Sequence, residues 1–94
     1  MILEDAVAFL RKVQPLAQLE PERLHALARR ASLDFYPKGT PVVGPDGAGQ
    51  GFAHAVRKGA LEADGLRFGP GELLGAHATR AVAARDTVSC LLPP

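Results

Sequence analysis

Hydrophobic residues recur at helical spacing in the first third of the chain. Over residues 2–13 the apolar positions fall on one helical face with charged positions between them, which predicts an amphipathic helix. A second helix is predicted over residues 21–31, because Leu24, Leu27 and Ala28 share one face and Pro21 suits the first helical position. Acidic side chains open both segments, as a helix dipole favours. We therefore expect the chain to begin with two helices.

After the second helix the pattern changes to short apolar runs separated by glycine and proline. Asp64-Gly65 lies between two such runs and is a strong hairpin signal. Gly69-Pro70-Gly71 predicts a sharp turn, and Glu72 is expected to cap that turn or to remain in solvent. Residues 44–51 have the composition of a loop, whereas residues 76–86 fit either a short helix or a strand with a turn. The predicted strands are residues 33–36, 40–43, 52–57, 60–63, 66–68, 73–74 and 87–92.

These elements predict an α+β fold, mainly β. Two N-terminal helices precede an antiparallel β-roll or jelly roll over about residues 33–92, since short strands separated by turns are typical of such architectures. The 94 residues make one domain, so residues 1–94 are assigned to a single unit. A hydrophobic content of 47% is enough for one core and excludes a disordered chain.

Charge and cysteine content narrow the functional classes. A net charge of +1 gives no field that implies nucleic acid, and no apolar run approaches the roughly 20 residues of a membrane-spanning helix. The single Cys90 cannot form an intramolecular disulfide, and its apolar setting predicts a buried packing thiol. The N-terminus lacks the basic residues of a signal peptide. We therefore expect a cytoplasmic location with no nucleic-acid or membrane partner.

Six motifs in a fixed order carry a family resemblance. They are Phe9-Leu10-Arg11-Lys12, Pro15-Leu16, the pattern from Leu19-x-Pro21-Glu22 to Leu27-Ala28, Tyr36-Pro37-Lys38-Gly39-Thr40, Phe68-Gly69-Pro70-Gly71-Glu72-Leu73-Leu74-Gly75, and Arg85-Asp86-Thr87 running into Cys90-Leu91-Leu92-Pro93. In this order they resemble the cyclic-nucleotide-binding domain. The last motif is most similar to sensor domains at the head of bacterial signalling proteins that carry CBS repeats and a nucleotidyltransferase-like domain. Family members continue into hinge and lid helices, which we expect to be lacking here.

The resemblance also implies a phosphate-binding cassette, which we expect to be degenerate. Binding members have a glycine–glutamate pair, a short helix and a proline–arginine pair. Gly75 matches the cassette glycine, whereas Ala76 replaces the glutamate with a methyl group that cannot accept a hydrogen bond. An ungapped register puts Arg85 in the arginine position. A shorter register, which leaves enough chain for the final strands, puts His77 there with Arg80 close by and deletes most of the helix.

We therefore predict a non-catalytic regulatory or sensor module without a cofactor. Its partners are expected to be other domains of a larger signalling protein or a homodimer partner. One alternative is a working sensor of cAMP or another nucleotide, with Gly75, His77 and Arg80 around the phosphate. A second alternative is a cupin-type enzyme. That reading needs paired histidines and a glutamate, but the three histidines of this chain share no metal-ligand spacing, so no metal site or catalytic residue is predicted.

Overall fold

The N-terminal third of the molecule is helical. The computed structural model describes residues 2–44, 47 and 51–93. Helix α1 spans Leu3–Leu10, the 3-10 helix η1 spans Leu16–Gln18, and α2 spans Pro21–Arg30. The two predicted helices are present, but the first is shorter than residues 2–13 and the second ends one residue earlier than predicted. No helix in the described ranges is long and apolar enough to cross a membrane.

The ends of both helices follow from local backbone chemistry. After α1 the chain tightens, because the Lys12 and Val13 N–H groups each donate to a carbonyl three residues back, at 3.0 Å. Pro15 then has no N–H group with which to continue a helix. At the end of α2, Ala31 takes an extended conformation with φ −76° and ψ 148°. The chain therefore passes directly from α2 into the first strand.

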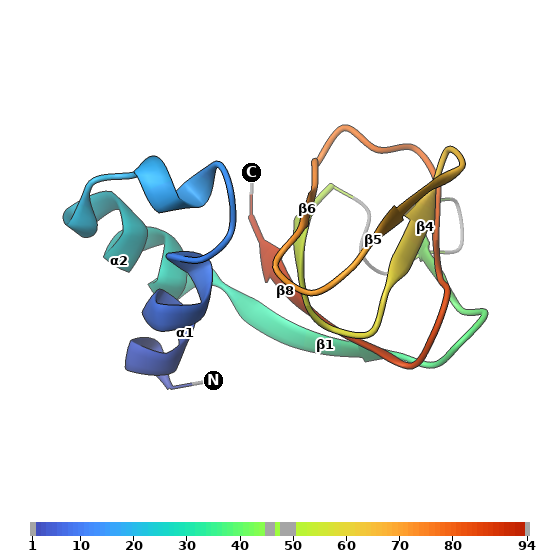
Figure 1. Cartoon of the computed structure of the whole chain (residues 1–94), viewed down its shortest axis with the longest axis horizontal. Helices are drawn as coiled ribbons and strands as arrows, with labels where there is room; N and C mark the ends of the chain where they lie inside the picture. The colour runs from blue at the N-terminus through green and yellow to red at the C-terminus, as the bar shows by residue number, and fades with distance from the viewer. Residues whose placement is uncertain (1, 45–46, 48–50, 94) are drawn as a thin grey trace.

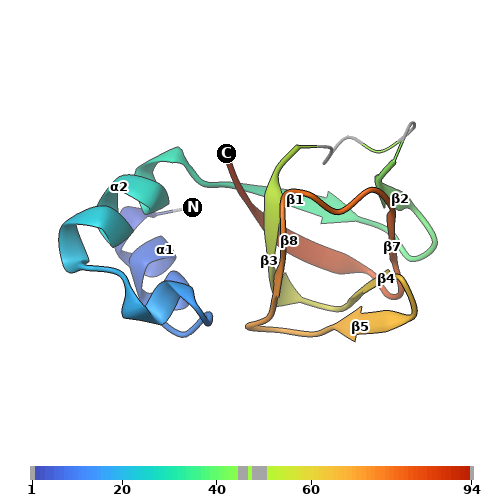
Figure 2. The same cartoon turned by 90° about the horizontal axis from the view of Figure 1, so that it is seen from above.

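Eight strands form two four-stranded antiparallel sheets. In chain order they are β1 (Ser32–Tyr36), β2 (Pro41–Val43), β3 (Ala53–Lys58), β4 (Leu61–Ala63), β5 (Leu66–Phe68), β6 (Leu73–Leu74), β7 (Ala81–Ala83) and β8 (Thr87–Leu92). The first sheet has the order β1-β8-β3-β6, and the second has the order β2-β7-β4-β5. Figures 1 and 2 show the helices gathered at one end of the molecule and the β-roll at the other. The predicted fold class is confirmed.

Residues 76–86, which the sequence left open between helix and strand, contain the strand β7. This strand pairs with β2 on one side and with β4 on the other. The Gly39 N–H donates to the Ala83 carbonyl at 2.7 Å, and the Ala83 N–H donates to the Thr40 carbonyl at 3.0 Å. Long-range pairing therefore decides the conformation of this alanine-rich segment.

Alternation along the first sheet separates two hydrophobic cores. On β3, Val56 points into the roll, whereas Ala55 points toward the helices, and on β8 Leu91 and Cys90 divide in the same way. Cys90 is fully buried against the helices and burial raises the pKa of its thiol, so the predicted packing role is confirmed. The buried roll core consists of Tyr36, Val42, Val43, Val56, Leu61, Ala63, Leu74, Ala81, Ala83 and Leu91.

Two predicted turns form as expected. Asp64 and Gly65 have φ values of 51° and 76°, and the flanking Ala63 and Leu66 are paired, which is the geometry of a tight β-hairpin. In the Gly69-Pro70-Gly71 turn, the Gly69 N–H donates to Glu72 Oε1 at 2.7 Å. Glu72 therefore caps this turn. The predicted loop at residues 44–51 falls mostly outside the described residues, of which only 44, 47 and 51 belong to it.

Buried polar side chains also lie inside the roll. His54 and Ser89 are both fully buried, and His54 Nδ1 lies 3.0 Å from Ser89 Oγ. The Tyr36 ring meets the His54 ring edge-on, with centroids 6.2 Å apart. The buried Tyr36 hydroxyl has no hydrogen-bond partner among the described residues. Burial, reinforced by the nearby negative charge of Asp34, raises the pKa of Tyr36 to about 12.

This shift predicts a loss of stability at alkaline pH. Because the pKa of Tyr36 in the folded chain lies above its ordinary value of 10.0, the stability that neutral Tyr36 contributes is fully present below pH 10 and is lost as pH rises toward 12. Tyr36 is the single tyrosine of the chain, so near-ultraviolet absorbance reports its ionisation directly. We expect this titration to coincide with alkaline unfolding. Tyr36→Phe should reduce the pH dependence between these values, leaving the part that the buried Cys90 thiol contributes. An unchanged dependence in that variant would contradict the assignment.

Candidate functional site

The connection between β6 and β7, residues 75–80, is a turn rather than a helix. The Ala78 N–H donates to the Gly75 carbonyl at 3.2 Å, which closes a single tight turn. All six residues of this connection are described, and none of them is helical. The connection therefore lacks the short helix that the family resemblance implies for a cassette.

Gly75 and His77 lie against each other within this turn. A Cβ atom added at Gly75 would lie 2.7 Å from His77 Cε1 and 3.0 Å from His77 Nδ1. Such distances are closer than van der Waals contact permits, so only glycine allows the imidazole to occupy this place. Gly75 is not among the glycines with positive φ, so the close approach of His77 is what this position requires of a glycine.

The other cassette positions divide between solvent and core. Ala76 is exposed, so the place of the expected glutamate carries only a methyl group in solvent. Ala78 is half-buried and packs against the roll core. Arg85 follows β7 and is exposed, so it lies outside the β6–β7 connection.

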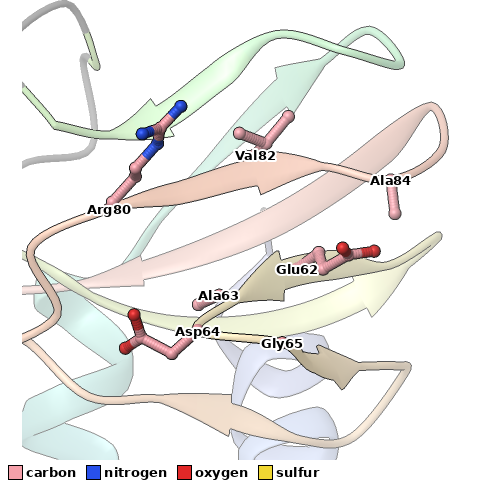
Figure 3. A pocket seen from close by; sticks show the side chains of 7 residues that line it. All are labelled: Glu62, Ala63, Asp64, Gly65, Arg80, Val82 and Ala84. Carbon is pink, nitrogen blue, oxygen red and sulfur yellow. The ribbon is translucent and has the colours of Figure 1, made fainter.

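Arg80 points away from the roll core. It immediately precedes β7, in which Ala81 and Ala83 are buried in the roll. Alternation therefore directs Arg80, Val82 and Ala84 to the outer face of the second sheet. Figure 3 shows Val82 on β7 with Arg80 and Ala84 at its two ends, and the Arg80 side chain reaches toward β2. The structure thus brings Gly75 and His77 together but places the Arg80 side chain on the outside.

Arg80 lines two neighbouring hollows on this outer face. The larger has a volume of about 370 Å³ and is also lined by Glu62 and Asp64. The smaller, of about 200 Å³, lies toward β2 and is lined by Pro41 and Thr79. Val82 belongs to both hollows. Sequence reasoning did not place Glu62 and Asp64 at this hollow, although the alternation of β4 and the Asp64-Gly65 hairpin could have placed them outside the roll.

The histidines do not assemble a metal centre. In the described part of the chain, no three His, Cys, Asp or Glu side chains come together as a metal site requires. His54 is in the roll core beside Ser89, whereas His25 on α2 and His77 in the turn are exposed. This arrangement does not fit the paired histidines and glutamate of a cupin.

Comparisons with known proteins bear on the fold. No protein-family model matches the sequence, and no curated protein matches it. Among solved structures, a mutant regulatory subunit of a cAMP-independent protein kinase A from Trypanosoma brucei, bound to cAMP, superposes with a TM-score of 0.77 at 20% identity over 96% of this chain. The corresponding subunit from Trypanosoma cruzi, bound to guanosine, gives 0.78 at 19% identity over 96%. The chain has the fold of cyclic-nucleotide-binding domains.

The length of the match differs between these neighbours. This chain spans 39% of the Trypanosoma brucei subunit and 38% of the Trypanosoma cruzi subunit, so it corresponds to less than half of each. A cyclic nucleotide-binding-like protein from Brucella abortus is matched over 90% of its length and 95% of this chain, with a TM-score of 0.65 and 24% identity. The cyclic-nucleotide-binding fold therefore accounts for nearly all of the present chain.

Proposed function

We propose that this chain is a non-catalytic regulatory module of the cyclic-nucleotide-binding type that no longer binds a cyclic phosphate in its cassette. The observation that carries the proposal is the β6–β7 connection. A single turn with the His77 ring packed on Gly75 occupies the segment in which a helix and an arginine would hold the phosphate. The loss of one charged hydrogen-bond partner alone costs about 1.5–3 kcal/mol, which corresponds to tenfold or more in affinity.

Contacts with other protein surfaces are the proposed means of action. Leu33 and Phe35 are 40% and 57% exposed and lie on the same face of β1. Leu33 is paired with Cys90, whose side chain packs under the helices, so this face continues the buried helix-facing surface of the first sheet. Exposed apolar side chains next to a buried apolar face are typical of a surface that another domain covers. Another domain of a longer protein or a second copy is the proposed occupant.

A second candidate is a sensor of an unphosphorylated nucleoside. The Trypanosoma cruzi neighbour is bound to guanosine, which carries no phosphate. A degenerate phosphate cassette would not by itself prevent a fold of this kind from taking such a ligand. Guanosine therefore belongs in any ligand screen beside cAMP and cGMP.

Calorimetric titration with cAMP, cGMP and guanosine tests the proposal. We expect no binding of either cyclic nucleotide at micromolar concentration. The double variant Ala76→Glu, His77→Arg returns two side chains of the cassette but not its helix, so we expect it to remain without micromolar affinity. Micromolar cAMP binding that is lost on His77→Ala would overturn the proposal. Guanosine binding without cAMP binding would favour the second candidate.

A further inference from the structure

One side of α2 carries a groove that the proposed function does not use. It has a volume of about 270 Å³ and lies at the helical end of the molecule, opposite to β4 and β5 (Figures 1 and 2). The α2 residues that line it follow the first of them by three, four and seven positions, so they form one stripe along the helix. The lining residues are Leu19, Arg23, Ala26, Leu27 and Arg30.

The groove has an apolar floor with an arginine toward each end. Leu19 and Leu27 are half-buried and pack against the core under the helices, whereas Ala26 is exposed. Arg23 and Arg30 are seven residues apart, which is about 10 Å along a helix and almost two full turns. Ala26 lies between them and has only a methyl group, so the backbone of another helix can approach α2 closely at this point.

Both arginines can bind a partner. Arg23 and Arg30 are exposed, and within residues 2–44, 47 and 51–93 neither guanidinium has an ion pair or a hydrogen bond. The nearest acidic residues along the chain are Glu20 at the N-cap and Glu22 in the first turn, and neither lines the groove. The groove therefore presents two positive charges and no carboxylate beside its apolar floor.

These charges and their spacing define what the groove can hold. A partner that neutralises both arginines needs two carboxylates about 10 Å apart, with apolar side chains between them to cover Ala26 and Leu27. A helix with acidic residues at positions i and i+7 and leucines at i+3 and i+4 has this pattern on one face. We propose that this groove of α2 docks an acidic amphipathic helix of a partner protein. The inference goes beyond the proposed function, because it involves neither the β6–β7 turn nor the exposed face of β1.

An anionic membrane would also neutralise the arginines, but α2 offers it little apolar surface. The strength with which a helix binds lipid increases with the apolar area that it inserts, and such helices present Trp, Phe or Leu side chains. The groove of α2 offers only the half-buried Leu27 and the small methyl group of Ala26 beside its arginines. The observations therefore favour a protein helix.

An NMR titration of the isotope-labelled whole chain with a synthetic peptide tests this inference. The alanine-based helical peptide carries two glutamates seven positions apart and two leucines between them, and its control peptide has glutamines in place of the glutamates. At about 0.1 M salt, charges more than about 10 Å apart are largely screened, so local ion pairs dominate. We expect saturable amide shifts at residues 19–30 below about 1 mM glutamate peptide, and weaker binding of the glutamine peptide.

Substitutions on α2 show whether the groove residues are responsible. Arg23→Gln and Arg30→Gln should each weaken binding of the glutamate peptide about two- to fivefold, as the loss of an exposed ion pair does. Ala26→Glu places a like charge opposite the peptide and should weaken binding about tenfold or more. Arg29→Gln is the matched control, because Arg29 is exposed on the same helix but does not line the groove, and it should leave the affinity unchanged.

Three results would overturn the inference. One is the absence of saturable shifts at residues 19–30 with millimolar glutamate peptide. Another is equal weakening by Arg29→Gln and Arg30→Gln, or equal affinity for the two peptides, since either shows non-specific binding. The third is sedimentation of the chain with phosphatidylserine-containing vesicles that is lost in the Arg23→Gln, Arg30→Gln double variant, without peptide binding, because it would assign the groove to a membrane. None of these results bears on the β6–β7 turn, so the proposed function is tested separately.

Discussion

Gly59→Ala should destabilise the fold by about 3–5 kcal/mol, a large fraction of the 5–15 kcal/mol that stabilises a typical domain. Gly59 has φ +89°, a conformation that costs an alanine about 1–2 kcal/mol by itself. A Cβ atom here would also lie 2.7 Å from Thr87 Oγ1 and 2.8 Å from Thr87 Cα, and it would clash with the Asp86 carbonyl oxygen. Because two of these three atoms are backbone, a side-chain rotation cannot relieve the contact.

Gly39→Ala is the matched control for this variant. Gly39 has a nearly identical φ of +87°, but a Cβ atom there meets nothing within 4 Å. We expect Gly39→Ala to cost only the conformational part, about 1–2 kcal/mol. Urea unfolding of both variants measures the difference. An equal decrease in the free energy of unfolding of the two variants would show that the β3–β4 turn does not contact the start of β8 closely.

Thr87→Val should cost about 2–4 kcal/mol, although it changes little but one hydroxyl group. Thr87 is fully buried, and its Oγ1 accepts from the Ala60 N–H at 3.1 Å. The same hydroxyl lies within donating distance of the Ala60 carbonyl, at 3.0 Å, and of the Arg85 carbonyl, at 2.7 Å. The valine variant would leave the buried Ala60 N–H unpaired, and an unpaired buried donor carries the full cost of its lost hydration.

Thr79→Val, at an exposed threonine, serves as the control and should change the free energy of unfolding by less than about 0.5 kcal/mol. The Gly59 and Thr87 variants should also combine non-additively, because both act on the same contact between the β3–β4 turn and the start of β8. The proposed contact would be contradicted if the losses of unfolding free energy were additive in the double variant. It would also be contradicted if Thr87→Val left the free energy of unfolding unchanged.

The helices and the tight turns could be predicted because their signals are local. Helical spacing and Pro21 located α2, and Asp64-Gly65 located the β4–β5 hairpin within a residue. The end of α1 was placed too late, since the apolar spacing continues to Val13 although the backbone tightens after Leu10. The spacing of apolar residues indicates which side of a segment is buried, not where the helix ends. Val13 is buried although it lies beyond α1.

The conformation around the candidate site could not be read from local signals. Ala81-Val82-Ala83 suits a helix or a strand equally, and its pairing with residues of β2 and β4 decides for the strand. That pairing directs Arg80 outward, where it lines the outer hollow with Glu62. The alanine at position 76 is visible in the sequence, whereas the packing of His77 on Gly75 depends on the folded turn.

The most direct test of the account is a titration of the isotope-labelled chain with cAMP up to millimolar concentration, monitored at the amides of residues 74–78 by NMR. Residues 75–78 form a single turn and no helix, so the proposed function predicts no saturable shifts at these residues. Saturable shifts there at micromolar cAMP, abolished by His77→Ala in a protein that remains folded, would show a working cassette and contradict the account.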